Sequence, residues 1–160
     1  MQFGSFAAAF ALVAWGADAA VPGSLNPFDG TWQMDLQRSQ LEPGDSRVKM
    51  VIAIQTLGMS VKYESESTYR NGRVVHVHYA AGYDGSPALV LGERGLMLPV
   101  SIARIDNNTM EVSYMRGLQV IAKSRNVVSP GGTTLTITTT LAAPTGHTVQ
   151  TVNVFSKVRL

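Results

Sequence analysis

His76 and His78 lie one residue apart in an extended segment, and histidine is the side chain best suited to proton transfer near neutral pH. The dipeptide Asn71-Gly72 precedes them and predicts a two-residue type I′ hairpin loop. In the register set by that loop, His76 lies opposite Ser67 and His78 lies opposite Ser65. The hairpin is therefore predicted to carry these polar side chains together on one face.

Charge indicates which face of this hairpin meets water. Tyr63 shares the face of the two serines, and Tyr69 lies close to the turn. Lys62, Glu64 and Glu66 occupy the other face, which is expected to be the solvated one. The histidine face then points into the protein interior. The same register places Val75, Val77, Tyr79 and Ala81 on the solvent side.

An interior face that combines His76 and His78 with serine and tyrosine has three possible uses. The imidazoles can orient the polar end of a ligand in an apolar cavity, or act as an acid and a base in catalysis. They can also simply form a hydrogen-bonded pair with no chemical role. A zinc site needs a third ligand, and His147 lies far along the chain, so no metal is predicted.

A second strand, 110–116, offers further candidates. Tyr114 and Arg116 share a face with Met110 and Val112, while Glu111 occupies the opposite face. If the apolar side is interior, Tyr114 forms a second wall of the pocket and Arg116 meets an anionic group at its opening. The alternative is that Arg116 simply extends to solvent from a strand end.

The composition limits the class of protein. The chain has 160 residues, and its 45% hydrophobic content fits one folded domain and excludes a disordered chain. Its 13 Lys and Arg against 11 Asp and Glu give a net charge of only +2, and the basic residues are scattered, which argues against a nucleic-acid surface. There is no cysteine, which excludes a disulfide or thiolate site, and no cofactor-binding motif is found.

The first twenty residues have the pattern of a processing segment. Residues 3–16 are apolar and uncharged, and Ala17-Asp18-Ala19-Ala20 resembles a signal-peptidase site. We therefore expect a signal peptide over 1–20, a mature domain over 21–160, and a secreted or periplasmic location. The alternative is that this segment stays as a first strand or helix, because no Lys or Arg precedes the apolar run. No other apolar run is long enough to span a membrane.

The mature chain alternates between apolar and polar residues in runs that recur about every ten residues, as antiparallel strands do. Glycine-containing turns such as Pro43-Gly44-Asp45, Asn71-Gly72 and Asp84-Gly85 separate the runs. No helical crossover lies between neighbouring strands, which excludes a parallel sheet. We predict an all-β fold: a single antiparallel up-and-down β-barrel of about eight to ten strands.

Several motifs resemble the lipocalins and the wider calycin superfamily. Gly30-Thr31-Trp32 opens the first strand as the Gly-x-Trp signature does, and the residues 30–45, 83–85, 104–112 and 152–158 resemble secreted bacterial lipocalin-like domains. The resemblance implies that Trp32 plugs the closed end of the barrel, covered by Arg159 or Lys157. It also implies a lumen for a small, mostly apolar molecule, without implying a reaction.

Three functions remain open at this point. The first is a secreted or periplasmic carrier or sensor that binds a small hydrophobic molecule through the candidate residues. The second is a cofactor-free lyase, isomerase or cyclase with His76 and His78 as acid and base. The third is a structural or self-associating envelope protein, and any of the three is compatible with a monomer or a homo-oligomer. The ligand-binding candidates are Tyr63, Ser65, Ser67, Tyr69, His76, His78, Tyr114 and Arg116.

Overall fold

The computed structural model describes residues 26–93, 95–142 and 146–159, so the predicted signal peptide at 1–20 lies outside the described residues. These residues form eleven strands in one sheet, and none of them forms a helix. Nor does this part of the chain contain a helix that is long and apolar enough to cross a membrane. The strands are β1 Gly30–Met34, β2 Arg47–Leu57, β3 Ser60–Tyr69, β4 Val74–Gly82, β5 Leu91–Gly92, β6 Gly95–Leu96, β7 Val100–Arg104, β8 Thr109–Arg116, β9 Gln119–Val128, β10 Thr134–Ala142 and β11 Thr148–Lys157.

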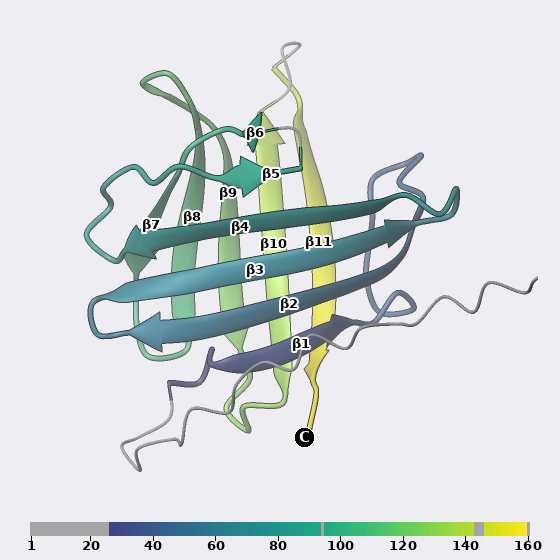
Figure 1. Cartoon of the computed structure of the whole chain (residues 1–160), viewed down its shortest axis with the longest axis horizontal. Helices are drawn as coiled ribbons and strands as arrows, with labels where there is room; N and C mark the ends of the chain where they lie inside the picture. The colour runs from purple at the N-terminus through teal and green to yellow at the C-terminus, as the bar shows by residue number, and fades with distance from the viewer. Residues whose placement is uncertain (1–25, 94, 143–145, 160) are drawn as a thin grey trace, which may run out of the picture.

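The sheet is an antiparallel meander that curls on itself (Figure 1). Sequential strands pair in order, and β1 pairs with both β2 and β11, which joins the first strand to the last. Between β4 and β7 the wall is completed by isolated bridges, Asp84 to Ala103 and Ala88 to Val100, and by the short β5–β6 hairpin. The predicted antiparallel barrel is confirmed, with this side more loosely paired than the rest.

Side chains alternate between the inside and the outside of the barrel, and the interior is sealed at one end. Trp32, Ile52, Leu135 and Phe155 meet there and are fully buried. Trp32 lies opposite Ile52 on one side and Lys157 on the other, which makes it the centre of this closed end. Burying large aromatic and aliphatic side chains at this closed end stabilises the barrel.

Lys157, rather than Arg159, covers Trp32. Its ammonium lies 4.8 Å from the centre of the indole ring and 3.3 Å from the Pro27 carbonyl oxygen. The indole N–H donates to the Phe28 carbonyl at 2.9 Å, so the tryptophan has no unsatisfied polar atom. Gly30 makes this closure possible, because its φ is 128° and an added Cβ would lie 2.9 Å from Lys157 Cε.

The β3–β4 hairpin differs from the two-residue loop that the sequence predicts. The Tyr69 N–H donates to the Arg73 carbonyl and the Gly72 N–H donates to the Tyr69 carbonyl, so Arg70, Asn71 and Gly72 form a three-residue loop. Gly72 has a φ of 80°, as the last residue of such a loop requires. The extra loop residue shifts the pairing of β4 against β3 by one position, and a shift of one turns every side chain of β4 to the other face.

Candidate functional site

The prediction that His76 and His78 point inward is wrong. In the shifted register His76 lies opposite Glu66 and His78 opposite Glu64, on the outer face. The His76 side chain is 57% exposed, and its Nδ1 lies 3.8 Å from a Glu66 carboxylate oxygen. The two imidazoles therefore have no access to the interior from these positions. Among the described residues, no three His, Asp or Glu side chains are grouped to hold a metal.

The same shift brings the other half of β4 inside. The side chains placed on the solvent side by the sequence, Val75, Val77, Tyr79 and Ala81, pair with the inward-facing Ser67, Ser65, Tyr63 and Val61. The inward prediction for Tyr63, Ser65 and Ser67 agrees with the structure, and both serines are buried. The wall of the interior that β3 and β4 form is therefore more apolar and more aromatic than predicted.

Burial along the inner wall falls from the closed end to the open end. On β10, Leu135 is fully buried, whereas Ile137, Thr139 and Leu141 face the same way and retain accessible surface. The β11 residues opposite them show the same trend from Phe155, fully buried, to Val149, 38% exposed. The inward residues of β10 and β11 above the closed end are therefore less buried than those at the closed end.

A cluster of three tyrosines spans this accessible part, and we call Tyr63, Tyr79 and Tyr114 the tyrosine cluster. Tyr63 and Tyr79 lie opposite each other on β3 and β4, and their rings stack at 4.7 Å with an interplanar angle of 11°. Tyr114 comes from β8 in the facing wall, and its hydroxyl lies 3.3 Å from Ser124 Oγ. Stacked aromatic rings of this kind give a rigid, mainly apolar contact surface for a ligand.

The surroundings of the tyrosine cluster raise the pKa values of its hydroxyls, which are neutral at neutral pH. Burial, with a smaller contribution from the nearby Tyr114, raises the pKa of Tyr63 well above its ordinary value of 10. Burial and the neighbouring Tyr63 raise the pKa of Tyr79, and burial raises that of Tyr114. At neutral pH the three hydroxyls are therefore uncharged hydrogen-bonding groups.

The wall of the interior that β9, β10 and β11 form carries two layers of neutral polar groups. In the upper layer, Ser124 Oγ lies 2.7 Å from Thr139 Oγ1 and also contacts Tyr114. In the layer below, Asn126 on β9 and Asn153 on β11 flank Ile137. The Oδ1 atoms of both asparagines are buried and accept no hydrogen bond, as is the case for Thr56 Oγ1 on β2. We call Asn126 and Asn153 the amide pair.

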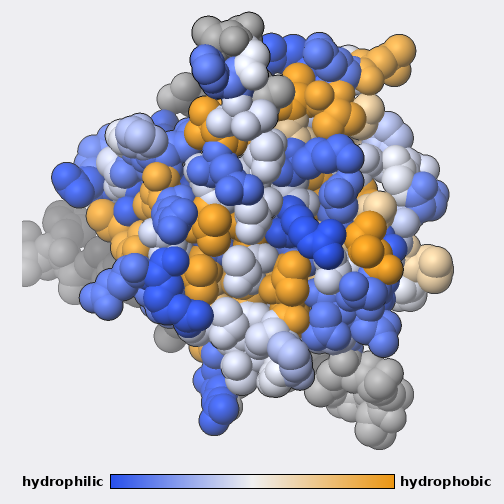
Figure 2. Space-filling model, turned by 180° about the vertical axis from the view of Figure 1, so that it is seen from behind, coloured by the Kyte–Doolittle hydropathy of each residue, from blue (hydrophilic) through white to orange (hydrophobic). Residues whose placement is uncertain are grey.

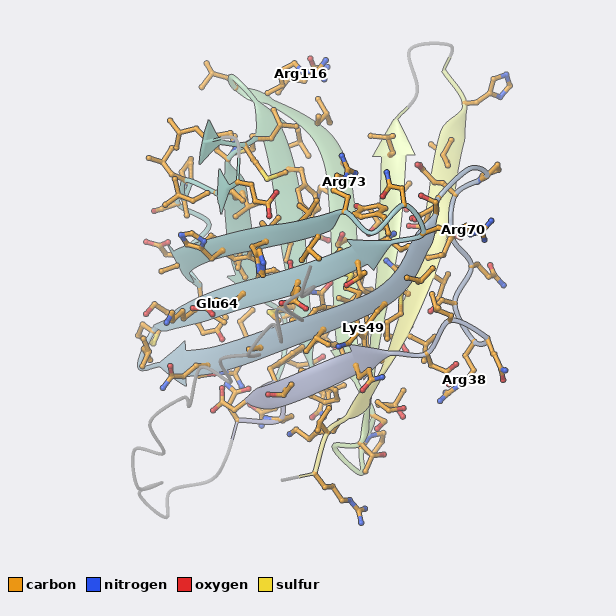
Figure 3. All side chains as sticks on the ribbon, turned by 45° about the vertical axis from the view of Figure 1, so that its right-hand side comes forward. Arg38, Lys49, Glu64, Arg70, Arg73 and Arg116 are labelled. Atoms are coloured by element: carbon orange, nitrogen blue, oxygen red, sulfur yellow. The ribbon has the colours of Figure 1, made fainter. Side chains whose placement is uncertain are left out.

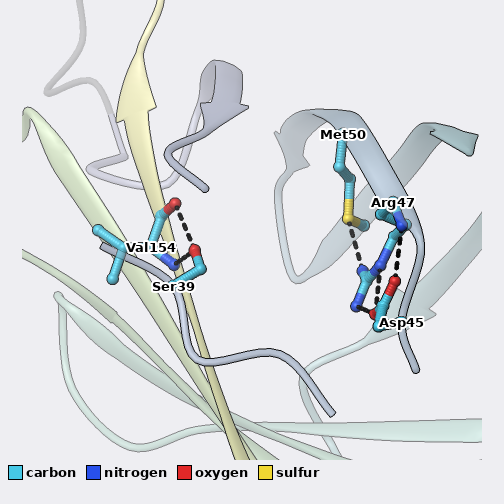
Figure 4. Close-up of polar contacts among 5 residues, drawn as sticks. All are labelled: Ser39, Asp45, Arg47, Met50 and Val154. Carbon is cyan, nitrogen blue, oxygen red and sulfur yellow. Dashed lines mark hydrogen bonds and ion pairs between the residues drawn. The ribbon is translucent and has the colours of Figure 1, made fainter. Parts of the chain in front are cut away.

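Arg47 is a charged side chain on the inner face, and it lies at the opening. A bulge at the start of β2 pairs it with Tyr69, and its guanidinium binds the Asp45 carboxylate and lies 3.2 Å from Met50 Sδ (Figure 4). The hydrogen bonds from Arg47 lower the pKa of Asp45, so this ion pair is intact at neutral pH. The opening also has a concavity of about 480 Å³, lined by residues 42–47, Tyr69 and Arg73.

The connection between β1 and β2, residues 35–46, leads to this opening. It is held against β11 where Ser39 Oγ accepts the Val154 N–H at 2.9 Å (Figure 4). Gln40 also forms a bridge with Val152. Tyr69 lies beside it, and the Arg73 guanidinium stacks 4.5 Å above the Tyr69 ring. Tyr69 therefore belongs to the rim of the opening rather than to its interior.

Of the two predicted candidates on β8, Tyr114 lies in the interior and Arg116 lies outside it. Tyr114 faces inward with Met110 and Val112, as expected. The pairing of β8 with β9 shifts directly after Tyr114, and Arg116 is exposed at the end of the strand. In Figure 3 it extends from the upper edge of the molecule, as Arg38 and Arg70 extend from peripheral loops. The structure thus favours the solvent-exposed alternative for Arg116.

Several inward polar residues were not predicted: Tyr79, Ser124, Asn126, Thr139 and Asn153. Their signal was present in the sequence, because each alternates in register with the apolar residues of its own strand. Ser124 and Asn126, for example, share a face with Ala122 and Val128. The sequence does not indicate that these inward polar residues belong to a functional site.

Comparisons with known proteins identify the fold. No protein-family model and no curated protein sequence matches this chain. Among solved structures it is similar to a Schistosoma mansoni fatty acid binding protein in complex with arachidonic acid, with a TM-score of 0.64 and 12% identity over 86% of this chain and 100% of that chain. It is also similar to the zebrafish ileal bile acid-binding protein complexed with cholic acid, with a TM-score of 0.56 and 18% identity over 82% of this chain and 99% of that chain.

The fold is a calycin-like β-barrel. At these identities the likeness establishes the architecture alone. The predicted calycin-like architecture is therefore confirmed. The secreted and bacterial part of the resemblance, and the 1–20 and 21–160 boundaries, stay predictions.

Proposed function

We propose that this protein binds a small, mostly hydrophobic molecule inside the barrel, as a secreted or periplasmic carrier or sensor. The observation that carries the proposal is the fall in burial along the inner wall, from a sealed floor at Trp32 and Phe155 to an accessible wall at Ile137 and Thr139. A mostly apolar, concave interior with a few inward polar groups is the usual form of a small-molecule site.

The structural neighbours support the class of ligand. Arachidonic acid and cholic acid are both small molecules with large hydrophobic surfaces, and each is held by a barrel similar to this one. The secreted or periplasmic setting is supported by the apolar segment 3–16 and the small residues at 17–20. A carrier or a sensor uses such a site without turnover.

Binding is favoured over the two alternative functions. The enzymatic hypothesis assigned acid–base roles to His76 and His78, and both lie on the outer face beside glutamates. The hypothesis of a purely structural envelope protein needs a filled interior, whereas Ile137 and Thr139 retain accessible surface. Arg47 and Tyr69 at the opening add a polar rim that a ligand passes on entry.

A fluorescence experiment with a matched pair of variants tests the proposal. N-phenyl-1-naphthylamine, a neutral hydrophobic probe, should bind the wild-type protein with a dissociation constant on the order of 1–10 μM. Thr139→Trp places an indole inside the barrel, and Thr138→Trp places the same group outside on the next residue. The first substitution should weaken binding at least about tenfold, and the second should leave it unchanged.

Circular dichroism shows whether both variants fold. If Thr139→Trp does not fold, Ile137→Phe with Thr136→Phe as its outer-face control makes the same comparison with a smaller side chain. Failure of the probe to bind the wild-type protein contradicts the proposal. So does an equal loss of binding in an inner-face variant and its outer-face control, since binding then takes place elsewhere.

A further inference from the structure

We infer that the ligand of this barrel carries a neutral polar group, such as a hydroxyl, which hydrogen-bonds to the amide pair Asn126 and Asn153 just above the closed end. This assignment rests on the proposed function and names the chemical class of the ligand. It follows from three observations: the unsatisfied amide oxygens, the neutral inward side chains around them, and the ion pair that Arg47 forms with Asp45.

The first observation concerns the amide pair itself. Asn126 is only 5% exposed, and the Oδ1 atoms of Asn126 and Asn153 are buried without a hydrogen-bond partner. Burying an unpaired amide costs free energy, so native proteins rarely leave one without a purpose. Both residues are neighbours of Ile137, directly above the level of Leu135 and Phe155. A ligand hydroxyl at this level donates its one proton to an amide oxygen of this pair.

The second observation is that the inward-facing side chains around the amide pair are neutral. Of the charged side chains that the pairing places on the inner face, Lys157 lies over Trp32 at the closed end, Arg104 is exposed at the end of β7, and Arg47 lies at the opening. The polar groups deeper inside are hydroxyls and amides, and the tyrosine hydroxyls remain protonated at neutral pH. A carboxylate placed there gains no cationic partner, and desolvating it is costly.

The third observation is that Arg47 does not supply a free cation. Asp45 already binds its guanidinium, and the ion pair is at the opening beside Tyr69. A carboxylate at Arg47 has to share the guanidinium with Asp45, and it then leaves the amide pair unsatisfied. A neutral alcohol leaves the Arg47–Asp45 ion pair undisturbed and can hydrogen-bond to the amide pair. Its hydroxyl therefore binds deep inside, and its apolar chain passes the tyrosine cluster toward the opening.

A competition experiment with two probes of equal chain length tests this inference. Dodecan-1-ol and dodecanoate are each used to displace N-phenyl-1-naphthylamine from the wild-type protein at pH 7.5. We expect the alcohol to compete at a concentration at least about tenfold lower than the carboxylate, because only the hydroxyl can donate to an amide oxygen and only the carboxylate loses ionic solvation. In the double variant Asn126→Leu and Asn153→Leu, this preference should fall to roughly threefold or less as the hydroxyl loses its partners.

The controls separate the possible outcomes. Asn107→Leu makes the same substitution at an exposed turn and should keep the preference for the alcohol. Thermal unfolding of each variant confirms that it folds, and Asn126→Ala serves if the leucines prevent folding. Equal or tighter binding of dodecanoate overturns the inference and leaves the proposed function intact. A preference that persists in the double variant overturns the assignment to the amide pair. Failure of the fluorescent probe itself contradicts the proposed function instead.

Discussion

At the scale of single residues, the interior is defined by groups that are polar but uncharged. Tyr63 and Tyr79 stack on one wall, and Ser124, Asn126 and Asn153 lie on the other. Neutral hydroxyls and amides can orient a ligand without the desolvation cost that buried charges impose. The charged groups of the same strands, such as the Lys62–Glu64 and Lys123–Glu111 pairs, are on the outer face.

The buried tyrosines make stability depend on pH in the alkaline range. Their pKa values are raised in the folded protein above the ordinary value of 10, so the unfolded chain loses these protons first. Their contribution is complete below pH 10 and declines as the pH rises beyond it, by up to about 1.4 kcal/mol per pH unit for each tyrosine. Urea unfolding at pH 8, 10 and 11 should show this decline.

Tyr79→Phe provides the comparison for that measurement. It keeps the ring stacked on Tyr63 and removes one ionisable hydroxyl, so the loss of stability between pH 10 and 11 should be smaller than in the wild type. Identical pH dependence in the two proteins would mean that Tyr79 titrates in the folded state as it does in the unfolded chain.

At the scale of elements, the β3–β4 hairpin decides which side chains enter the interior. Its loop of Arg70, Asn71 and Gly72 sets a register that puts Tyr79 inside and both histidines outside. The loop depends on the positive φ of Gly72, a conformation that a residue with a Cβ adopts only with strain. Hairpin geometry, more than any one interior side chain, therefore shapes this wall of the site.

The comparison of two alanine substitutions tests the role of this turn. Gly72 and Gly131 both have open space where a Cβ would be added, but only Gly72 has a φ in the left-handed region. Gly72→Ala should lower the free energy of unfolding by about 1–2 kcal/mol, whereas Gly131→Ala should be neutral or slightly stabilising. Chemical denaturation measures both, and equal effects would show that the φ of Gly72 is not what matters.

This hairpin also shows which features of the fold can be predicted from the sequence and which cannot. The alternation in the strands and the turn residues are sufficient to predict an antiparallel barrel, and the charges on β3 correctly predict its outer face. The Asn-Gly pair is compatible with both a two-residue and a three-residue loop, since each puts glycine at positive φ. The choice is made by tertiary packing, which buries Val77 and Tyr79 in preference to His76 and His78. The greater hydrophobicity of that half of β4 was the available clue.

The other interior residues were harder to predict. Asn126 and Asn153 come from strands that are far apart in the sequence, and they flank Ile137 only because β10 lies between β9 and β11. Arg47 reaches the inner face through a bulge between Arg47 and Lys49, which simple alternation does not reveal. In contrast, Tyr114 follows the regular alternation of β8 and was predicted correctly.

At the scale of the whole molecule, the barrel has two unlike ends and two unlike faces. The closed end joins the first and last strands around Trp32, with Lys157 over the indole ring. The outer surface is mixed, and the view from behind shows hydrophobic patches separated by hydrophilic side chains (Figure 2). The opening is bordered by the segment 42–47, Tyr69 and Arg73. Under the proposed function, a ligand enters past this border.

The most direct test of the account is an NMR titration of the ¹⁵N-labelled protein with dodecan-1-ol. The side-chain amide signals of Asn126 and Asn153 should shift in a saturable way, together with the backbone signals of Tyr63 and Thr139. The signals of His76 and His78 on the outer face should stay in place. Saturable shifts centred on the histidines, with unchanged signals from the amide pair, would contradict the claim that the interior of this barrel is its binding site.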